Sequence, residues 1–323
     1  MRKGCIDFLR IFASLAVVLI HILTGSASYH ETVTGITAPD WTVIVHDFLY
    51  WAVPVFFMIT GYCICSKEEC TYKYCFKHIK KYVIMLFTVG LLFAILELIF
   101  DKGSFSFSLL TEAILNIING KSWAHMWFIY AIIGVYLVLP VIHKFMRTKE
   151  NYILVILLFI FTILLPQIND LLGTSIDIYF PFGNFIFYVC FGALIANIKL
   201  DKIPTILISV GCLLIWIGSI VDDPFRKVGY YNIFVCLSAV AIFMLFCLID
   251  YNSSRFVSVM ADCSWGVYII HPVIINFVLK FLKLDMLASY GVLKTILFYI
   301  VTTVISFVGI YIIRKIPILK KIF

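Results

Sequence analysis

The first apolar run of the chain contains three ionisable residues. Asp7, Arg10 and His21 lie in a segment that otherwise has the composition of a transmembrane helix. Charged groups at such depth are costly and usually mark a pathway or an active site. Histidine is the side chain whose unperturbed pKa best suits proton transfer at neutral pH. The residue types therefore predict proton-transfer chemistry inside a membrane.

The spacing places these side chains on one face of a helix. The eleven-residue step from Arg10 to His21 turns a helix by roughly 1,100°, which is three turns plus about 20°. Asp7 and Ser14 lie three residues before and four residues after Arg10, on or near the same face. The rise between Arg10 and His21 is roughly 16 Å, about half the hydrocarbon thickness of a bilayer. We therefore expect Arg10 near one membrane surface and His21 deeper.

A second interpretation of this polar stripe is purely structural. Arg10 would extend to the interface and pair with Asp7, while His21 would satisfy a hydrogen bond in the protein core. The spacing alone does not separate this interpretation from the functional one.

The elements that must position these residues are membrane spans. Hydrophobic residues make up 63% of the 323 residues and charged residues 13%, against roughly 25% charged residues in a soluble domain. We predict an all-α, polytopic membrane bundle forming a single domain over 1–323, without an additional soluble domain. About ten spans are expected, at 6–25, 44–65, 79–100, 125–146, 151–166, 182–198, 204–221, 230–249, 265–282 and 291–313. Residues 108–119 are too short to cross and are expected in the interface.

Lysine and arginine counts in alternate loops predict the orientation of these spans. One side receives seventeen basic residues, including Lys67, Lys73, Lys77, Lys80 and Lys81, and the other side receives seven. Both termini are therefore expected in the cytoplasm, although Lys280, Lys283 and Lys294 locally break the rule. The net charge of +7 is explained by this topology and does not indicate binding to nucleic acid. The N-terminus resembles a signal peptide but has no convincing cleavage site, so we expect it to be retained.

The ten cysteines lie mostly inside spans or at their cytoplasmic ends. Thiols there pack as small apolar groups in a reducing compartment, so disulfides are not expected. Cys63, Cys65, Cys70 and Cys75 form a loose cluster whose spacing lacks the paired short knuckles of a zinc site. No metal is expected.

Four stretches stand out once the spans are placed. They are Asp-Phe-Leu-Arg at 7–10 with His21; Pro-Val-Phe-Phe-Met-Ile-Thr-Gly-Tyr at 54–62, followed by Lys77, Lys80 and Lys81; His-Met-Trp-Phe at 125–128, with Tyr136 and Pro140 later; and Ser-Trp-Gly-Val-Tyr-Ile-Ile-His-Pro at 264–272.

Together these stretches resemble the membrane acyltransferase family 3, and the resemblance covers essentially the whole chain. Members of that family have an Arg and a His separated by ten residues in the first helix, an aromatic stretch ending in Ser-Gly-Phe or Ser-Gly-Tyr, basic residues before the third helix, and a late Ser-Tyr-x-x-Tyr-x-x-His pattern. This chain differs at Thr60, Met126 and Trp265, where Ser, Leu and Tyr are usual. Lysines replace the usual arginines before the third helix, which removes bidentate phosphate recognition but keeps the charge.

The resemblance implies transfer of an acyl group, most often acetyl, from cytoplasmic acyl-CoA to a hydroxyl. The acceptor would be a sugar of an envelope polysaccharide or of its lipid-linked precursor, and the location would be the cell (plasma) membrane. The phosphates of acyl-CoA would bind Arg10, Lys77, Lys80 and Lys81, with Lys77 and Lys80 favoured because they lie nearest the third helix. Lys67 and Lys73 fit an ordinary positive-inside loop equally well.

Within this chemistry His21 is the candidate base that removes the proton of the acceptor hydroxyl. Asp7 would hold Arg10, since charges within membranes pair. His21 could instead carry the acyl group covalently before passing it outward. The sequence leaves both mechanisms open.

Four further residues are candidates for substrate binding. His125 and Trp127 could stack on a sugar but fit an interfacial aromatic belt equally well. Glu97, near the external end of the third span, is a candidate for meeting the acceptor. His271 is favoured as a core residue that bonds backbone freed by Pro272. Thr60, Gly61 and Tyr62 are expected to allow close helix contact.

Two other functions fit about ten spans with buried charge. A multi-pass transporter or exporter of a small solute, such as an amino acid, would use the polar stripe as a solute path. The sequence shows no Gly- or Pro-broken helices in corresponding halves, the usual pointer to an inverted repeat. A non-catalytic receptor or scaffold would tolerate replacement of His21. The acyl group, the acceptor and the oligomeric state are left open.

Overall fold

The computed structural model of the protein describes residues 3–102, 106–120, 123–148, 150–174, 185–223 and 229–320. In these ranges the chain is helical and has no strand, which confirms the predicted all-α class. The α-helices are α1 (Gly4–Thr34), α2 (Asp40–Phe48), α3 (Ala52–Cys65), α4 (Tyr72–Met85), α5 (Leu91–Lys102), α6 (Phe107–Ile118), α7 (Trp127–Phe145), α8 (Asn151–Phe159), α9 (Leu165–Leu172), α10 (Ile186–Asn197), α11 (Lys202–Asp222), α12 (Ile233–Cys247), α13 (Arg255–Asn276), α14 (Gly291–Ile313) and α15 (Pro317–Lys320).

Short turns of other helix types join several of these elements. Three π-helical turns continue their neighbours without a break, and one 3₁₀ turn precedes α7: η1 (Leu86–Gly90), η2 (Ala124–Met126), η3 (Ile160–Leu164) and η4 (Phe277–Phe281). Eight stretches in the described ranges are long and apolar enough to cross a membrane. The chain is therefore a multi-pass helical membrane protein.

Two predicted spans are shorter than expected. The spans predicted at 182–198 and 230–249 correspond to α10 with 12 residues and α12 with 15, although residues 182–184 lie outside the described part of the chain. Most of α10 is buried among other helices. A helix enclosed by protein does not need to match the thickness of the bilayer. The basic residues Arg2, Lys121, Lys149, Arg226, Lys227 and Lys321, used to predict topology, also lie outside the described ranges.

Other predicted boundaries moved for local reasons. The span predicted at 44–65 is two helices, α2 and α3, with the break just before Pro54. Proline lacks a backbone N–H and is favoured in the first turn of a helix, where none is needed. Helix α4 begins at Tyr72, not 79, because the Thr71 side chain accepts a hydrogen bond from the Tyr74 amide. Likewise α13 begins at Arg255, capped by Ser254.

Helices α3 and α10 cross with their backbones in close contact. A side chain at Gly61 would collide with the carbonyl of Val189, and one at Gly192 would collide with the carbonyl of Met58. Small residues at such crossings let membrane helices approach closely. The contact predicted around Gly61 is confirmed.

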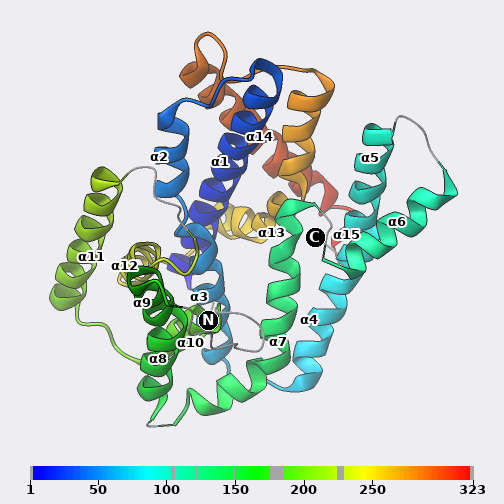
Figure 1. The fold of residues 1–323 in the computed structure, drawn as a ribbon. Helices are drawn as coiled ribbons and strands as arrows, with labels where there is room; N and C mark the ends of the chain where they lie inside the picture. The colour runs from blue at the N-terminus through cyan, green and yellow to red at the C-terminus, as the bar shows by residue number, and fades with distance from the viewer. Residues whose placement is uncertain are drawn as a thin grey trace.

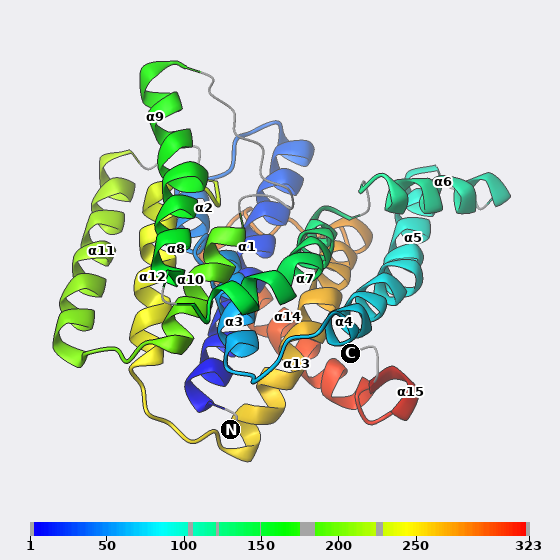
Figure 2. The ribbon, with the colours of Figure 1, turned by 90° about the horizontal axis from the view of Figure 1, so that it is seen from below.

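Two views agree on the arrangement of the helices. In Figure 1 and Figure 2, α11 lies at one edge of the molecule and α4, α5 and α6 lie at the opposite edge, with α1, α3 and α13 between them. Large apolar side chains on α11 and α14 are exposed, including Leu207 and Ile300. Exposed apolar faces of this extent are typical of helices that contact lipid.

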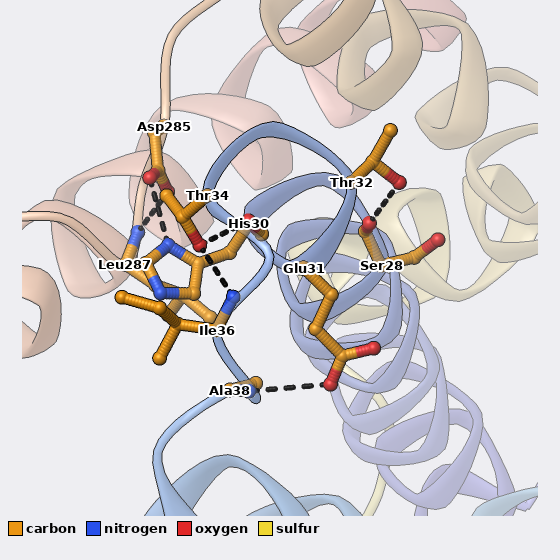
Figure 3. Close-up of polar contacts among 9 residues, drawn as sticks. All are labelled: Ser28, His30, Glu31, Thr32, Thr34, Ile36, Ala38, Asp285 and Leu287. Atoms are coloured by element: carbon orange, nitrogen blue, oxygen red, sulfur yellow. Dashed lines mark hydrogen bonds and ion pairs between the residues drawn. The ribbon is translucent and has the colours of Figure 1, made fainter.

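The first helix continues nine residues beyond its predicted end at residue 25 and is tied to the opposite end of the chain. His30 Nδ1 donates to Asp285 Oδ2 at 2.8 Å, as Figure 3 shows. Burial alone would raise the pKa of Asp285, but hydrogen bonds from His30 and from the Leu287 amide hold that pKa below its usual value.

Helix α1 ends at Gly35, which adopts a left-handed conformation with φ 69°. This long helix fixes its polar stripe against α13.

Candidate active site

A cavity of about 460 Å³ lies among α1, α3, α4, α7 and α13. Both Arg10 and His21 line it, and α1 is helical without interruption between them. The shared face predicted from their spacing is therefore confirmed, and the cavity extends along roughly 16 Å of helix. Asp7 and Ser14 are buried next to this face and do not line the cavity.

Basic side chains gather at the Arg10 end of the cavity. Lys81 and Arg314 line the cavity together with Arg10. Arg10 Nη2 donates to the thiol sulfur of Cys63 at 3.4 Å. Arg314 pairs with Asp262, with 3.6 Å between Nη2 and Oδ2. The pairing of Asp7 with Arg10 stays a prediction.

Aromatic rings form the wall between the two ends of the cavity. The rings of Tyr82 and Trp265 meet edge to face, with centroids 5.2 Å apart. Trp265 stacks on Tyr268 at 5.5 Å. This part of the wall is thus formed by packed aromatic rings.

Three imidazole rings come together at the far end of the cavity. The ring centroid of His21 lies 5.0 Å from that of His271 and 6.3 Å from that of His125, and the latter two are 6.0 Å apart. The hydroxyl of Tyr268 donates to the backbone carbonyl of His125, which ties α13 to the start of α7. His21 and His125 line the cavity, whereas His271 lies behind them. Three helices thus supply one histidine cluster.

A backbone contact settles the tautomer of His21. Its Nδ1 lies 2.9 Å from the carbonyl oxygen of Val17, four residues earlier in α1. A carbonyl can only accept, so Nδ1 carries the proton and Nε2 of the neutral ring holds a lone pair. The His21 ring is therefore oriented by its own helix with Nε2 available as a base.

His271 is held in the same way, by the carbonyl of Val267 at 2.9 Å. The carbonyl that Pro272 deprives of its helical donor is that of Tyr268, and the His271 ring interacts with this backbone group as well as with that of Val267. The Nε2 atoms of His271 and His125 are buried and have no hydrogen-bond partner among the described residues. Unsatisfied buried nitrogens beside a cavity are costly in a purely structural core and are typical of sites that bind a ligand.

Five of the predicted site residues do not line the cavity: Asp7 and His271, described above, and Lys77, Lys80 and Glu97. Lys77 and Lys80 are exposed on α4 and do not line it. Glu97 is partly exposed and pairs with Lys280, with 3.7 Å between Oε1 and Nζ. Lys81, which was not favoured over its neighbours, is the lysine that faces the cavity.

Sequence reasoning missed several lining residues, and one pattern could have found some of them. Tyr74, His78, Lys81 and Tyr82 all line the cavity from α4. They follow the i, i+4, i+7, i+8 spacing of a single helix face. Arg314, by contrast, approaches Asp262 only through the tertiary fold.

Comparison with known proteins identifies the family. The family model described as "Acyltransferase domain", of acyltransferase family 3, matches residues 3–315. The chain belongs to this acyltransferase family. No curated protein and no solved structure matches the chain.

The family assignment makes the protein a membrane acyltransferase and confirms the resemblance seen in its four motifs. The acyltransferase motifs meet in space, since the first, second, third and fourth stretches each contribute residues to the cavity. Within the described residues, no group of three His, Cys, Asp or Glu side chains is placed to hold a metal ion.

Proposed function

We propose that this acyltransferase moves an acetyl group from cytoplasmic acetyl-CoA to a hydroxyl of an envelope saccharide or of its lipid-linked precursor. The observation that carries this proposal is that one cavity joins a cluster of cations to a histidine with an available Nε2. A donor with charged phosphates at one end and a reactive thioester at the other matches both ends.

The donor would enter from the basic end. Arg10 and Lys81 bind its phosphates, and the extended arm passes along the rings of Tyr82, Trp265 and Tyr268. The separation of roughly 16 Å between Arg10 and His21 along α1 places the thioester beside His21. The basic end then faces the cytoplasm, which agrees with cytoplasmic termini in the plasma membrane.

The transfer step uses His21 as a general base. Its Nε2 takes the proton of the acceptor hydroxyl while the hydroxyl oxygen attacks the thioester carbon. The carbon–sulfur bond then breaks, and the imidazolium returns its proton to the leaving CoA thiolate. In the covalent variant, His21 Nε2 attacks the thioester carbon and CoA leaves as the thiolate. The acceptor hydroxyl then attacks the acyl carbon, the bond between that carbon and Nε2 breaks, and the hydroxyl proton passes to the CoA thiolate.

The acceptor would bind beside the histidine cluster. Trp127 and Tyr230 line this part of the cavity, and their ring centroids are 5.3 Å apart. Adjoining aromatic faces give a sugar ring an apolar surface to lie on, while Nε2 of His125, which lines the cavity, is left to be hydrogen-bonded. This pairing of flat rings with a polar atom supports a saccharide as the acceptor.

The deciding experiment is a donor assay on the purified protein in detergent. We expect acetyl-CoA to bind and to lose its thioester slowly in the absence of acceptor, because water can replace the hydroxyl. Free CoA released from acetyl-CoA is measured with a thiol reagent, and binding by calorimetry. Absence of both binding and thioester loss across several acyl-CoA donors would overturn the proposal.

A further inference from the structure

Arg314 is placed where a donor phosphate would be bound, although it lies at the last span and far from the other motifs in sequence. It follows α14 directly and lines the same cavity as Arg10 and Lys81. Its Nη1 donates to the backbone carbonyl of Asp262 on α13 at 2.9 Å. That bond holds the guanidinium at the wall of the cavity whatever the charge of the neighbouring carboxylate.

The ion pair between Arg314 and Asp262 is a loose one. The Nη2 and Oδ2 atoms are 3.6 Å apart, and the two side chains are 22% and 40% exposed. Charge-assisted hydrogen bonds between guanidinium and carboxylate are normally about 2.7–2.9 Å long. A phosphate oxygen that binds Arg314 at normal length can therefore replace the carboxylate without breaking the backbone bond.

The charge balance of this end also favours an anion. Arg10, Lys81 and Arg314 bring three cations, and Asp262 is the one acid among the described residues that line the cavity. Arg314 and Lys81 line the same cavity from different helices. Like charges held together repel each other, and a phosphate placed between them would relieve that repulsion.

We propose that Arg314 is a phosphate-binding residue for the acyl donor and that Asp262 is the counter-ion that holds this subsite until the donor arrives. The inference rests on the proposed function, in which the donor is acyl-CoA. Two groups of that donor share the required chemistry, the 3′-phosphate and the diphosphate bridge. The experiment separates them.

The test compares two donors in Arg314→Gln, acetyl-CoA and acetyl-3′-dephospho-CoA. We expect the KM for acetyl-CoA to rise about tenfold to hundredfold, because a charge-assisted bond is lost, while kcat changes little. If Arg314 binds the 3′-phosphate, the KM for the dephospho donor stays at its wild-type value. If it binds the diphosphate, the KM rises for both donors. Arg255→Gln is the matched control, because Arg255 is exposed on α13 and does not line the cavity.

Substitution of the counter-ion Asp262 gives a second test, which can be carried out even if Arg314→Gln does not fold. Asp262→Asn removes the competing carboxylate, and we expect acetyl-CoA to bind about two- to fivefold more tightly. A merely structural pair would instead lower the thermal midpoint with no gain in affinity, which would overturn the inference. An unchanged KM in well-folded Arg314→Gln would also overturn it and leave the proposed function intact, since wild-type turnover would persist. Failure of wild-type protein to bind acetyl-CoA would overturn both.

Discussion

The two ends of the cavity are built in opposite ways. At the basic end, long side chains from α1, α4 and the end of α14 make loose contacts, such as the 3.6 Å pair of Arg314 and Asp262. At the histidine end, two of the three rings are fixed by the helices that carry them, as the 2.9 Å bonds of His21 and His271 to their own backbones show. Adjustable cations suit the capture of a flexible anion, whereas a proton transfer requires a fixed ring. Substitutions at the basic end should therefore weaken donor binding by moderate factors, whereas substitution of the base at the histidine end should lower kcat severely.

The largest effect is expected at His21. His21→Gln should lower kcat by about 10²- to 10⁴-fold, since the general base is lost, and leave acetyl-CoA binding nearly unchanged. The rate of CoA release and the dissociation constant are measured on the same preparation. His30→Gln is the control, because His30 lies on the same helix outside the cavity. Retained turnover in His21→Gln would remove this residue from the base role.

Substitution of Arg10 should give the next largest effect, and this effect should be on KM rather than on kcat. Arg10→Gln is expected to raise the KM for acetyl-CoA about tenfold to hundredfold and to change kcat little, because a phosphate contact is lost. Steady-state kinetics separate the two constants. Arg147→Gln serves for comparison, since Arg147 bonds the backbone of Glu68 at 2.6 Å and does not line the cavity. A fall in kcat with unchanged KM would contradict the division between the two ends.

His271 sharpens the comparison, because activity and stability should move differently. Its buried Nε2 lacks a partner among the described residues, so His271→Leu should leave the thermal midpoint unchanged or raise it. We expect kcat to fall about tenfold, since the His271 ring packs against the His21 ring, with centroids 5.0 Å apart, and helps to keep it in position. Thermal melts and initial rates are measured in parallel. Unchanged kcat would show that His271 is only a core residue.

The smallest effects are expected on α4. Lys81→Gln should raise the KM for acetyl-CoA about threefold, because Lys81 faces the cavity, while Lys77→Gln should leave it unchanged. These lysines lie on the same helix and have the same charge, so the pair separates the effect of lining the cavity from the effect of charge alone. Equal effects of both substitutions would indicate a general surface potential rather than a defined phosphate site.

The bounds of a span can be predicted from the sequence where an apolar run is flanked by polar residues on both sides. The spans predicted at 204–221 and 291–313 agree closely with α11 and α14. The start of α13 was missed because residues 255–264 mix polar and apolar side chains, and hydropathy alone does not detect a capped polar helix. The short length of α10 follows from its enclosure by other helices, which depends on tertiary packing and not on local sequence.

The site was predictable along a helix and much less so between helices. Helical spacing alone predicts that Arg10 and His21 share one face of a helix, and the structure shows that both line one cavity. The meeting of His21, His125 and His271 required the packing of three helices, although each was singled out by its motif. Arg314 approaches Asp262 across 52 positions of sequence, and no spacing rule connects residues so far apart. The sequence favours Lys77 and Lys80 because they lie nearest the predicted third span. In the structure, helix α4 begins at Tyr72 and contains both lysines, so nearness to the helix does not distinguish them.

The unbroken course of α1 has a consequence for donor selection. Because one continuous helix carries both Arg10 and His21, their backbone positions keep a fixed separation, and only the reach of the Arg10 side chain can adjust to the ligand. On the proposed donor, α1 acts as a ruler of roughly 16 Å. An arm shorter or longer than this length would bring its thioester before or beyond the His21 ring, so the enzyme would reject it by length without any contact that recognises its chemistry.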